Sequence, residues 1–270
     1  MPIVTISRGS GRGGLMLATE VAERLGYEAV SREDLVAEAT GFGVSEGELR
    51  EALVKPPGLW GRFSRQRNRY LAFVQATLCQ RVQEGGVVYH GNAGHLLLPG
   101  VAHVLCVRLI APVAFRVQNL RESAGMEEDE ALAYIEKVDR EREQWTRFLY
   151  GVSWLDPTLY DLCINLRTMG IQDAVELVLS TARATPFQPT EESRRAMQDL
   201  VLASRVRASL AADAHTAGTE VEVRASGSTV FLRGRVRPAS VVDSVLEVVE
   251  GVEGVAQVDR SDLAAPDYTV

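Results

Sequence analysis

The sequence predicts an α/β domain, a parallel sheet with flanking helices, followed by a small α+β domain whose elements run α-β-β-α-β. Short β-rich runs alternate with helical stretches from Pro2 to about Ser180, which is typical of a parallel sheet whose strands are joined by helices. Pro186 and Pro189 then break this pattern, and a shorter unit with its own strands and helices follows. The 270 residues are enough for one large domain or two smaller ones.

The first domain opens with the order strand, glycine-rich loop, helix. Residues 3–6 are β-branched and lead directly into a cluster of glycines, after which apolar residues recur at helical spacing from 15 to 25. Gly26 follows as a helix stop. Two nearly continuous apolar runs, at 86–90 and 103–110, predict further strands of a sheet that is covered on both faces.

The second domain is predicted to contain two helices and three strands. Helical spacing runs through 192–212 and 241–249, and alternating apolar residues predict strands at 219–225 and 229–236, joined by a Ser-Gly-Ser turn. A last strand is predicted at 254–258. These patterns divide the chain into a domain at 1–184, a linker at 185–190, a second domain at 191–263 and a tail at 264–270.

The composition argues against several kinds of protein. Apolar residues make up 46% and charged residues 24%, which is typical of a globular chain and argues against disorder. Acidic residues outnumber basic ones 36 to 29, and the net charge of −7 argues against nucleic acid as a partner held by bulk charge. Lys55 and Lys137 are the two lysines, so phosphate recognition must depend mainly on arginine.

The compartment is predicted from what the sequence lacks. There is no charged leader followed by an apolar segment at the start, and no uncharged stretch reaches the ~18 residues that span a bilayer. We therefore expect a cytoplasmic protein. Cys79, Cys106 and Cys163 lack the paired spacing of a metal or redox site and are predicted to be buried apolar residues.

The glycine cluster is a candidate phosphate-binding loop. Gly9, Gly11, Gly13 and Gly14 lie between a strand and a helix, where backbone N–H groups and the helix dipole both favour an anion. A tight turn without a ligand is the alternative. The nucleotide-kinase consensus G-x-x-x-x-G-K-[ST] is not matched, because Gly14 takes the lysine position and the hydroxyl position is also changed.

The sequence departs from that consensus at two positions, Gly14 and Leu15. Leu15 stands where the consensus has the hydroxyl that holds magnesium, so a metal ligand is missing as well as the main cation. Arg8 and Arg12 are candidate substitutes for the lysine. Their forked guanidinium groups differ in geometry from a lysine, so an equal rate does not follow.

Residues 3–180 resemble the cytidylate kinase-like family of phosphate-loop proteins. The most specific part is 134–165, with the K-x-D-R-x-R run from Lys137 to Arg142, the stretch 151–157 and the Y-D-L-x-x-N ending. The resemblance implies a phosphate-loop kinase-like sheet, a nucleoside monophosphate site and an arginine-rich lid. It also implies phosphoryl transfer from ATP to CMP or dCMP, with Mg²⁺ expected.

The resemblance also suggests roles for particular residues. Arg8, Arg12, Arg140 and Arg142 would be catalytic, and Ser10, Gly11, Gly13 and Gly14 would bind ATP. Arg116, Arg121, Lys137, Asp139 and Asp161 would bind the substrate, and no residue is assigned as a metal ligand.

Two alternatives to these roles remain open. The lid bases, Arg147 among them, also fit a solvated helix face on which they pair with Glu136, Asp139, Glu141 and Glu143. Arg116 and Arg121 fit ordinary surface charges equally well.

Cytidylate kinases proper carry a D-G-R-D segment whose arginine grips the monophosphate, and this segment is changed here. The aligned residues are His90-Gly91-Asn92-Ala93. Loss of such a contact typically lowers the rate of phosphoryl transfer ~100-fold or more. The alternative to an active kinase is therefore a catalytically weak or inactive nucleotide-binding regulator.

Residues 191–263 resemble a BON domain, through Val221, Val223, the V-F-L-R-G-R-V strand and the valines that follow. BON domains are associated with phospholipid surfaces or partner proteins. Four arginines, Arg224, Arg233, Arg235 and Arg237, form a basic face that would suit an anionic surface, and a plain solvated sheet face is the alternative. Gly234 is predicted to mark a bulge or the close approach of a helix. The sequence leaves the oligomeric state open.

Overall fold

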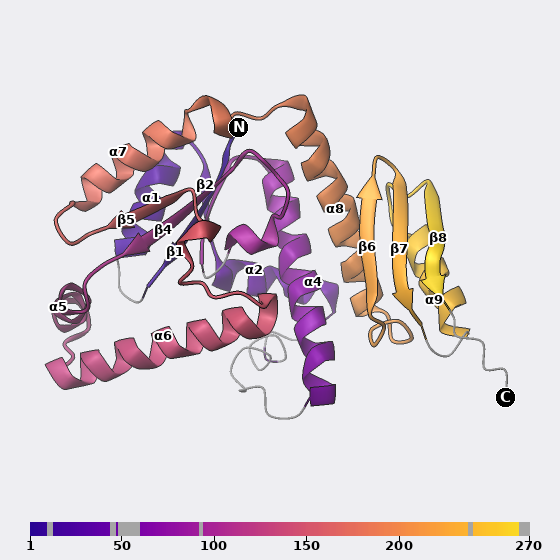
Figure 1. Cartoon of the computed structure of the whole chain (residues 1–270), viewed down its shortest axis with the longest axis horizontal. Coiled ribbons are helices and arrows are strands. Elements are labelled where there is room, and N and C mark those ends of the chain that lie inside the picture. The colour runs from indigo at the N-terminus through magenta and orange to yellow at the C-terminus, as the bar shows by residue number, and fades with distance from the viewer. Residues whose placement is uncertain (10–12, 44–46, 48–59, 92–93, 237–239, 265–270) are drawn as a thin grey trace. The chain divides into compact units, whose positions relative to one another are not determined.

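The computed structural model describes residues 1–9, 13–43, 47, 60–91, 94–236 and 240–264 (Figure 1). The chain divides into two units, one made of residues 1–34 and 84–190 and the other of residues 35–83 and 191–270. They are called the first and second unit below. The domain boundaries given above stay predictions.

The first unit is built on a five-stranded parallel sheet, as the sequence predicts. The strand order is β2-β3-β1-β4-β5. The strands are β1 (Ile3–Arg8), β2 (Glu28–Ser31), β3 (Val87–His90), β4 (Val104–Ile110) and β5 (Leu162–Asn165). β1 lies in the centre, and its Ile6 is paired with His90 on one side and Val107 on the other. The first five residues of β1 are buried, which explains its unbroken run of β-branched residues.

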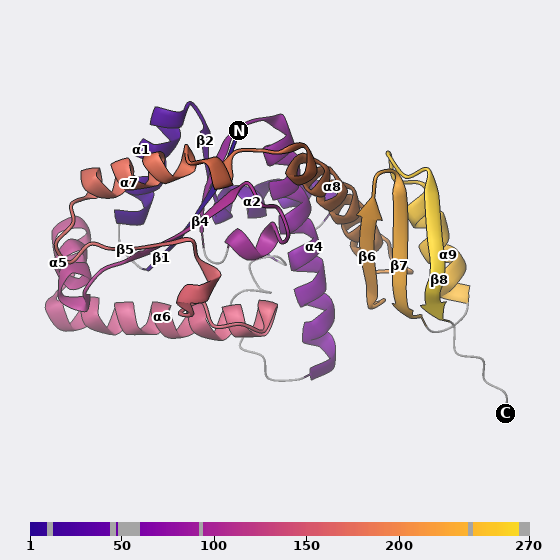
Figure 2. The same ribbon diagram turned by 45° about the horizontal axis from the view of Figure 1, so that its top comes forward.

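Two helices cover one face of this sheet, α1 (Gly13–Leu25) and α7 (Ile171–Ala182) (Figures 1 and 2). Their apolar stripes pack on the alternate side chains of β1 and β4 that point the same way, such as Val4, Ile6 and Leu105. Burial of this cluster is the main stabilising contribution of the sheet's helical layer.

Two further helices, α5 (Val113–Ala124) and α6 (Glu128–Tyr150), pack against each other through Val117, Leu120 and Ile135. The chain also forms α2 (Arg32–Glu38), α4 (Trp60–Glu84) and short 3₁₀ turns at Ala39–Phe42, Gly94–Leu97, Pro157–Leu159 and Thr185–Phe187.

The start of the first unit differs in detail from the prediction. β1 continues two residues past the predicted end at residue 6, so Arg8 is the last residue of a strand. α1 begins at Gly13 rather than at Leu15, so Gly13 and Gly14 belong to the first helical turn. Both shifts bring Arg8 and the glycines close together.

The second unit contains the predicted α-β-β-α-β order: α8 (Glu191–Ala212), β6 (Val221–Ser226), β7 (Thr229–Arg235), α9 (Ser240–Glu250) and β8 (Gln257–Ala264). β7 is the central strand, antiparallel to β6 and parallel to β8. Val206, Val223, Leu232 and Val245 are among the residues of its core.

The prediction for the last strand was wrong at both ends. Gly254 has a φ of +97° and lies in a turn, so the strand begins at Gln257. It continues to Ala264, where the carbonyl oxygen accepts a hydrogen bond from the amide of Val236 at 3.1 Å. The valine-rich stretch before residue 257 therefore belongs partly to the turn.

Gly234 is explained by the approach of a strand end rather than a helix. Its φ is +147°, and a Cβ there would come within 2.7 Å of the carbonyl oxygen of Glu220. A side chain at this position would push β6 and β7 apart.

The outer face of the small sheet carries acids opposite its arginines. Arg233 is paired across the strands with Glu222 on one side and Asp262 on the other, and Arg224 donates to Glu222 at 2.8 Å. Arg237, also predicted on this face, lies outside the described residues. The described part of the face is therefore mixed in charge, as the solvated alternative predicts.

The structure tests the expectations for the cysteines and for membrane-spanning helices. Cys79 is buried as predicted, whereas Cys163 is exposed, because it lies on the outward side of β5. Within the described ranges, no helix combines the length and apolar character needed to cross a membrane.

Candidate functional site

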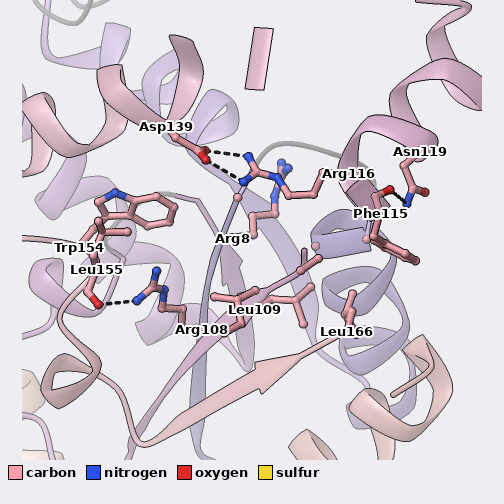
Figure 3. A pocket seen from close by; sticks show the side chains of 15 residues that line it. Arg8, Arg108, Leu109, Phe115, Arg116, Asn119, Asp139, Trp154, Leu155 and Leu166 are labelled. Atoms are coloured by element: carbon pink, nitrogen blue, oxygen red, sulfur yellow. Dashed lines mark hydrogen bonds and ion pairs between the residues drawn. The ribbon is translucent and has the colours of Figure 1, made fainter. Parts of the chain in front are cut away.

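A cavity of about 230 Å³ lies at the carboxyl ends of β1 and β4 (Figure 3). The chain leaves β1 toward one edge of the sheet and later returns to place β4 on the other side, so this is where the strand order reverses. In open parallel sheets, ligands bind at this place, outside the carboxyl ends of the strands. The lining residues come from β1, the start of α1, β4, α5, α6 and the segment that contains Trp154.

Arg8 lies across the first turn of α1. A Cβ on Gly14 would overlap the Cβ, Cγ and Cδ atoms of Arg8, so the glycine leaves room for the arginine side chain. Burial lowers the pKa of Arg8, and the carboxylate of Glu33 acts in the opposite direction. The sequence predicts Arg8 as a substitute for the missing lysine, and the structure places it directly over the position where that lysine would be.

Arg116 and Asp139 form a two-pronged ion pair within the cavity, with N–O distances of 2.7 and 2.8 Å (Figure 3). Arg116 comes from α5 and Asp139 from α6, so the pair also ties the two helices together. The Arg116 side chain is 12% exposed. Its guanidinium carbon would lie 3.3 Å from a Cβ on Gly9, so the charged group packs against Gly9, the first residue of the glycine-rich segment 9–14.

Arg142 reaches the end of β1 from α6. Its Nη1 donates a hydrogen bond to the carbonyl oxygen of Arg8 at 2.8 Å. Burial and the positive charge of Arg8 lower the pKa of Arg142 to about 10, whereas Asp139 acts in the opposite direction. Arg8 and Arg116 therefore line the cavity together with Gly9, Gly13 and Gly14, and Asp139 is the carboxylate among its described lining residues. Arg142 is joined to them through its hydrogen bond to the Arg8 carbonyl.

The other predicted lid residues lie on the opposite side of α6. Arg140 pairs with Glu136 at 3.4 Å, and Lys137 lies 4.0 Å from Glu141. The Arg140 and Lys137 side chains are 65% and 70% exposed. Positions 139, 142 and 146 share the inner face of the helix. The solvated-face alternative therefore describes Arg140 and Lys137, and the lid stays a prediction for Arg142.

Arg121 and Asp161, two further predicted residues, lie away from the cavity. Arg121 is exposed and pairs with Glu128 at 3.4 Å. Asp161 accepts a hydrogen bond from the amide of Cys106 at 2.8 Å, so its carboxylate joins β4 to the start of β5. Ser10, Gly11 and Arg12 lie outside the described residues, as do Asn92 and Ala93.

Arg108 lines the cavity and was not singled out in the sequence. Its Nη1 donates to the carbonyl oxygen of Leu155 at 2.6 Å, and its guanidinium carbon lies 5.1 Å from the Trp154 ring centre and 5.7 Å from that of Tyr160. Such stacking on aromatic rings holds an arginine in place without neutralising it. The sequence feature that could have identified Arg108 is its single charge within the apolar run of β4, residues 104–110.

The residues present fit the phosphates of a nucleotide better than they fit a metal ion. Arginines and glycine backbone surround the cavity, and these are donors for phosphate oxygens. Among the residues that the structure describes, no group of three His, Cys, Asp or Glu side chains could hold a metal. Asp139 is already engaged by Arg116.

A five-stranded parallel sheet with a glycine-rich segment between its first strand and first helix, and a basic cavity at the strand ends, is the α/β architecture of phosphate-loop kinase-like proteins. Residues 3–168 match the cytidylate kinase-like family, and residues 198–264 match the BON domain. The chain belongs to the cytidylate kinase-like family and carries a C-terminal BON domain.

Three individual proteins are similar to parts of this chain. Over 181 residues, 66% of this chain and 97% of the relative, the chain is 30% identical to the cytidylate kinase of Ignicoccus hospitalis. A stretch of 107 residues, 39% of this chain, is 35% identical to 20% of the uronate isomerase of Corynebacterium glutamicum. An uncharacterized protein from Eubacterium ventriosum has the same fold, with a TM-score of 0.53 and 18% identity over 68% of this chain and 99% of that one.

Proposed function

We propose that the first unit transfers a phosphoryl group from ATP to a nucleoside monophosphate, CMP or dCMP. The observation that carries this proposal is the presence of Arg8 and Arg116 in the cavity lining beside Gly9, Gly13 and Gly14, with Arg142 hydrogen-bonded to the Arg8 carbonyl. Burial is the main cause of the lowered pKa of Arg142, and repulsion from Arg8 and Arg116 lowers it further. Phosphate groups would offset that repulsion, so the cluster favours a polyanionic ligand.

Each residue has a role that follows from its position. Arg8 and the backbone amides of the glycine-rich segment would hold the donor phosphates, and Arg142 would stabilise the charge on the transferring group. Asp139 would act as a positioning residue, because its two contacts fix the guanidinium plane of Arg116. Arg108 would face the acceptor, held in place by Trp154.

The reaction itself requires little covalent chemistry from the protein. An oxygen of the acceptor phosphate forms a bond to the γ-phosphorus, and the bond from that phosphorus to the β–γ bridging oxygen breaks, which gives ADP and a nucleoside diphosphate. A phosphate monoester is largely ionised at pH 7, since its second pKa is about 6, so the acceptor needs no general base. Mg²⁺, expected from the family, would arrive with the nucleotide phosphates.

The second candidate is a nucleotide-binding regulator with little or no turnover, whose BON domain contacts a partner protein or a membrane surface. Gly14 and Leu15 favour it, because neither provides the cation or the hydroxyl of the kinase consensus. The absence of a metal-binding carboxylate cluster from the described residues also favours it.

Calorimetric titration with ATP-magnesium and with CMP, followed by an assay for CDP on the same sample, separates the two candidates. Binding of both ligands with CDP formation supports the kinase. Binding without CDP supports the regulator, and no binding of either ligand contradicts both. dCMP, UMP and AMP serve as comparison acceptors.

A further inference from the structure

The second unit contains a cavity of its own, of about 390 Å³, that the proposed kinase reaction does not use. It is lined by residues of α4, of the end of α8 and of the segment that leads into β6. Arg69, Arg207 and Thr216 are among the lining residues. Small-molecule sites commonly have volumes of ~300–1,000 Å³, so the cavity is large enough for an organic ligand.

Arg207 is a lining residue whose guanidinium has buried N–H donors without acceptors among the described residues. Its Nη1 donates to the carbonyl oxygen of Val223 at 3.3 Å, a long hydrogen bond. Its Nε and Nη2 atoms are buried and have no hydrogen-bond partner among the described residues. Burial lowers its pKa, and the neighbouring Cys79 thiol acts weakly in the opposite direction. A buried guanidinium without a carboxylate is costly, so a function that uses its free donors is expected.

In this cavity the basic side chains are more buried than the acidic ones. Arg69 also has a buried Nε without a hydrogen-bond partner, and its guanidinium carbon lies 5.9 Å from the Phe73 ring centre. Glu220 and Glu222 are exposed lining residues, and Glu222 is paired with Arg224. The negative charges thus lie at the exposed edge, and the donors that need acceptors lie within.

We infer that this cavity binds a small molecule through an oxyanion, phosphate or carboxylate, that is held by Arg207 with help from Arg69. A planar guanidinium presents pairs of N–H donors whose spacing matches two oxygens of such a group. The ligand is either a free metabolite or the headgroup of a lipid, which share this chemistry. The inference concerns the second unit and stands whether or not the first unit is a kinase.

Hydrogen–deuterium exchange on the full chain tests this inference locally. The probes are inorganic phosphate, acetate and phosphatidylglycerol vesicles, each added at constant ionic strength. We expect slower exchange in peptides that cover residues 68–75 and 207–222. Any response of peptides that cover the first cavity is recorded separately in the same sample, so phosphate binding there does not confuse the result.

Arg207→Met is the decisive variant, because it keeps an unbranched apolar stem and removes the guanidinium donors. We expect the protection to require at least ~10-fold more probe, the loss typical of one charge-assisted contact. Arg205→Met is the matched control, since Arg205 is exposed on the same helix and donates to Gln83 at 3.1 Å. If Arg207→Met unfolds, Arg207→Lys retains a charge without the fork, and we expect it to weaken binding as well.

The pattern of protection identifies the kind of ligand or overturns the inference. Protection by phosphate or acetate that Arg207→Met removes and Arg205→Met retains supports a metabolite site. The same pattern with vesicles alone supports a lipid headgroup. Absence of local protection with all three probes, or equal protection in the Arg207→Met variant, overturns the inference.

Discussion

Arg8 occupies the space above Gly14 that any side chain at residue 14 would need. The last side chain of β1 and the first turn of α1 are therefore matched to each other. A cation that reaches the glycine-rich segment from the strand replaces one that would otherwise project from the helix. Because of this relationship, the effects of substitutions at Gly14 and Arg8 on ATP binding can be predicted.

Gly14→Ala is expected to weaken ATP binding at least ~10-fold, because it displaces Arg8 from the cavity. Overpacking at this point should also destabilise the fold by ~1–3 kcal/mol. Gly85→Ala is the control, since no described atom lies within 4 Å of a Cβ there and Gly85 is not among the residues that line the cavity. Calorimetry with ATP and urea unfolding of both variants measure the two effects.

Gly14→Lys alone should likewise lose binding rather than gain activity, because the lysine and Arg8 compete for one space. The double variant Arg8→Ala with Gly14→Lys removes this conflict and should recover binding relative to Gly14→Lys. Equal binding by wild type and Gly14→Ala would show that Arg8 takes no part in holding the nucleotide.

Arg142 and Arg140 are two residues apart on α6 and should differ sharply in effect. Arg142→Gln is expected to lower kcat/KM for CDP formation ~100-fold or more, the typical cost of one donor to a developing charge. Arg140→Gln should change it less than ~2-fold, because its exposed pair with Glu136 is worth little. Steady-state rates with ATP and CMP measure both, and in a protein without turnover the affinity for ATP replaces the rate.

If α6 presented its outer face to the bound nucleotide, the Arg140 variant would lose more activity than the Arg142 variant. A large loss in Arg140→Gln with a small loss in Arg142→Gln would therefore contradict the assignment of the inner face to the site.

Arg108→Met should raise the KM for the acceptor ~10-fold and leave the KM for ATP within ~2-fold, since Arg108 lies toward Trp154 rather than along the glycine-rich segment. Arg167→Met, a change at an exposed arginine that follows β5, is the control. Initial rates with each substrate varied in turn provide the measurement. An equal rise in both KM values would indicate a general disturbance of the cavity instead.

The contrast between Arg108 and Arg140 shows what the sequence predicts well and what it does not. The strand-glycine-helix start and the parallel sheet follow from local patterns, namely β-branched runs and helical spacing, which depend on near neighbours. Arg140 and Arg142 look equivalent in the K-x-D-R-x-R run, and only packing against α5 and β1 decides which face is inward. Arg108 acts through residues 154–160, nearly fifty positions away, a relation that no local pattern contains.

The limits of β8 show the same dependence on distant contacts. Apolar valines predict a strand from residue 254, but the hydrogen bonds to β7 begin at Gln257, after the turn at Gly254. Pairing with a neighbouring strand, which lies nearly thirty residues earlier in the sequence, fixes where the strand begins.

His95 should make the stability of the first unit depend on pH between 6.5 and 4. It is 8% exposed beside the Tyr160 ring, and burial lowers its pKa to about 4 although the Asp161 carboxylate acts in the opposite direction. Above pH 6.5 the ring is neutral in both folded and unfolded chains, so it makes no difference there. As the pH falls from 6.5 to 4, the unfolded chain takes up a proton that the folded chain does not, which destabilises the fold by roughly 3 kcal/mol.

Urea unfolding followed by tryptophan fluorescence at pH 7 and pH 4.5 measures this loss. His95→Leu removes the titrating group, so the difference in unfolding free energy between the two pH values should shrink by most of that amount. His215→Gln, at an exposed histidine of the second unit, should leave the difference unchanged. A wild-type pH dependence that His95→Leu retains in full would mean that other groups cause it, and that the His95 ring is protonated as readily in the fold as in the unfolded chain.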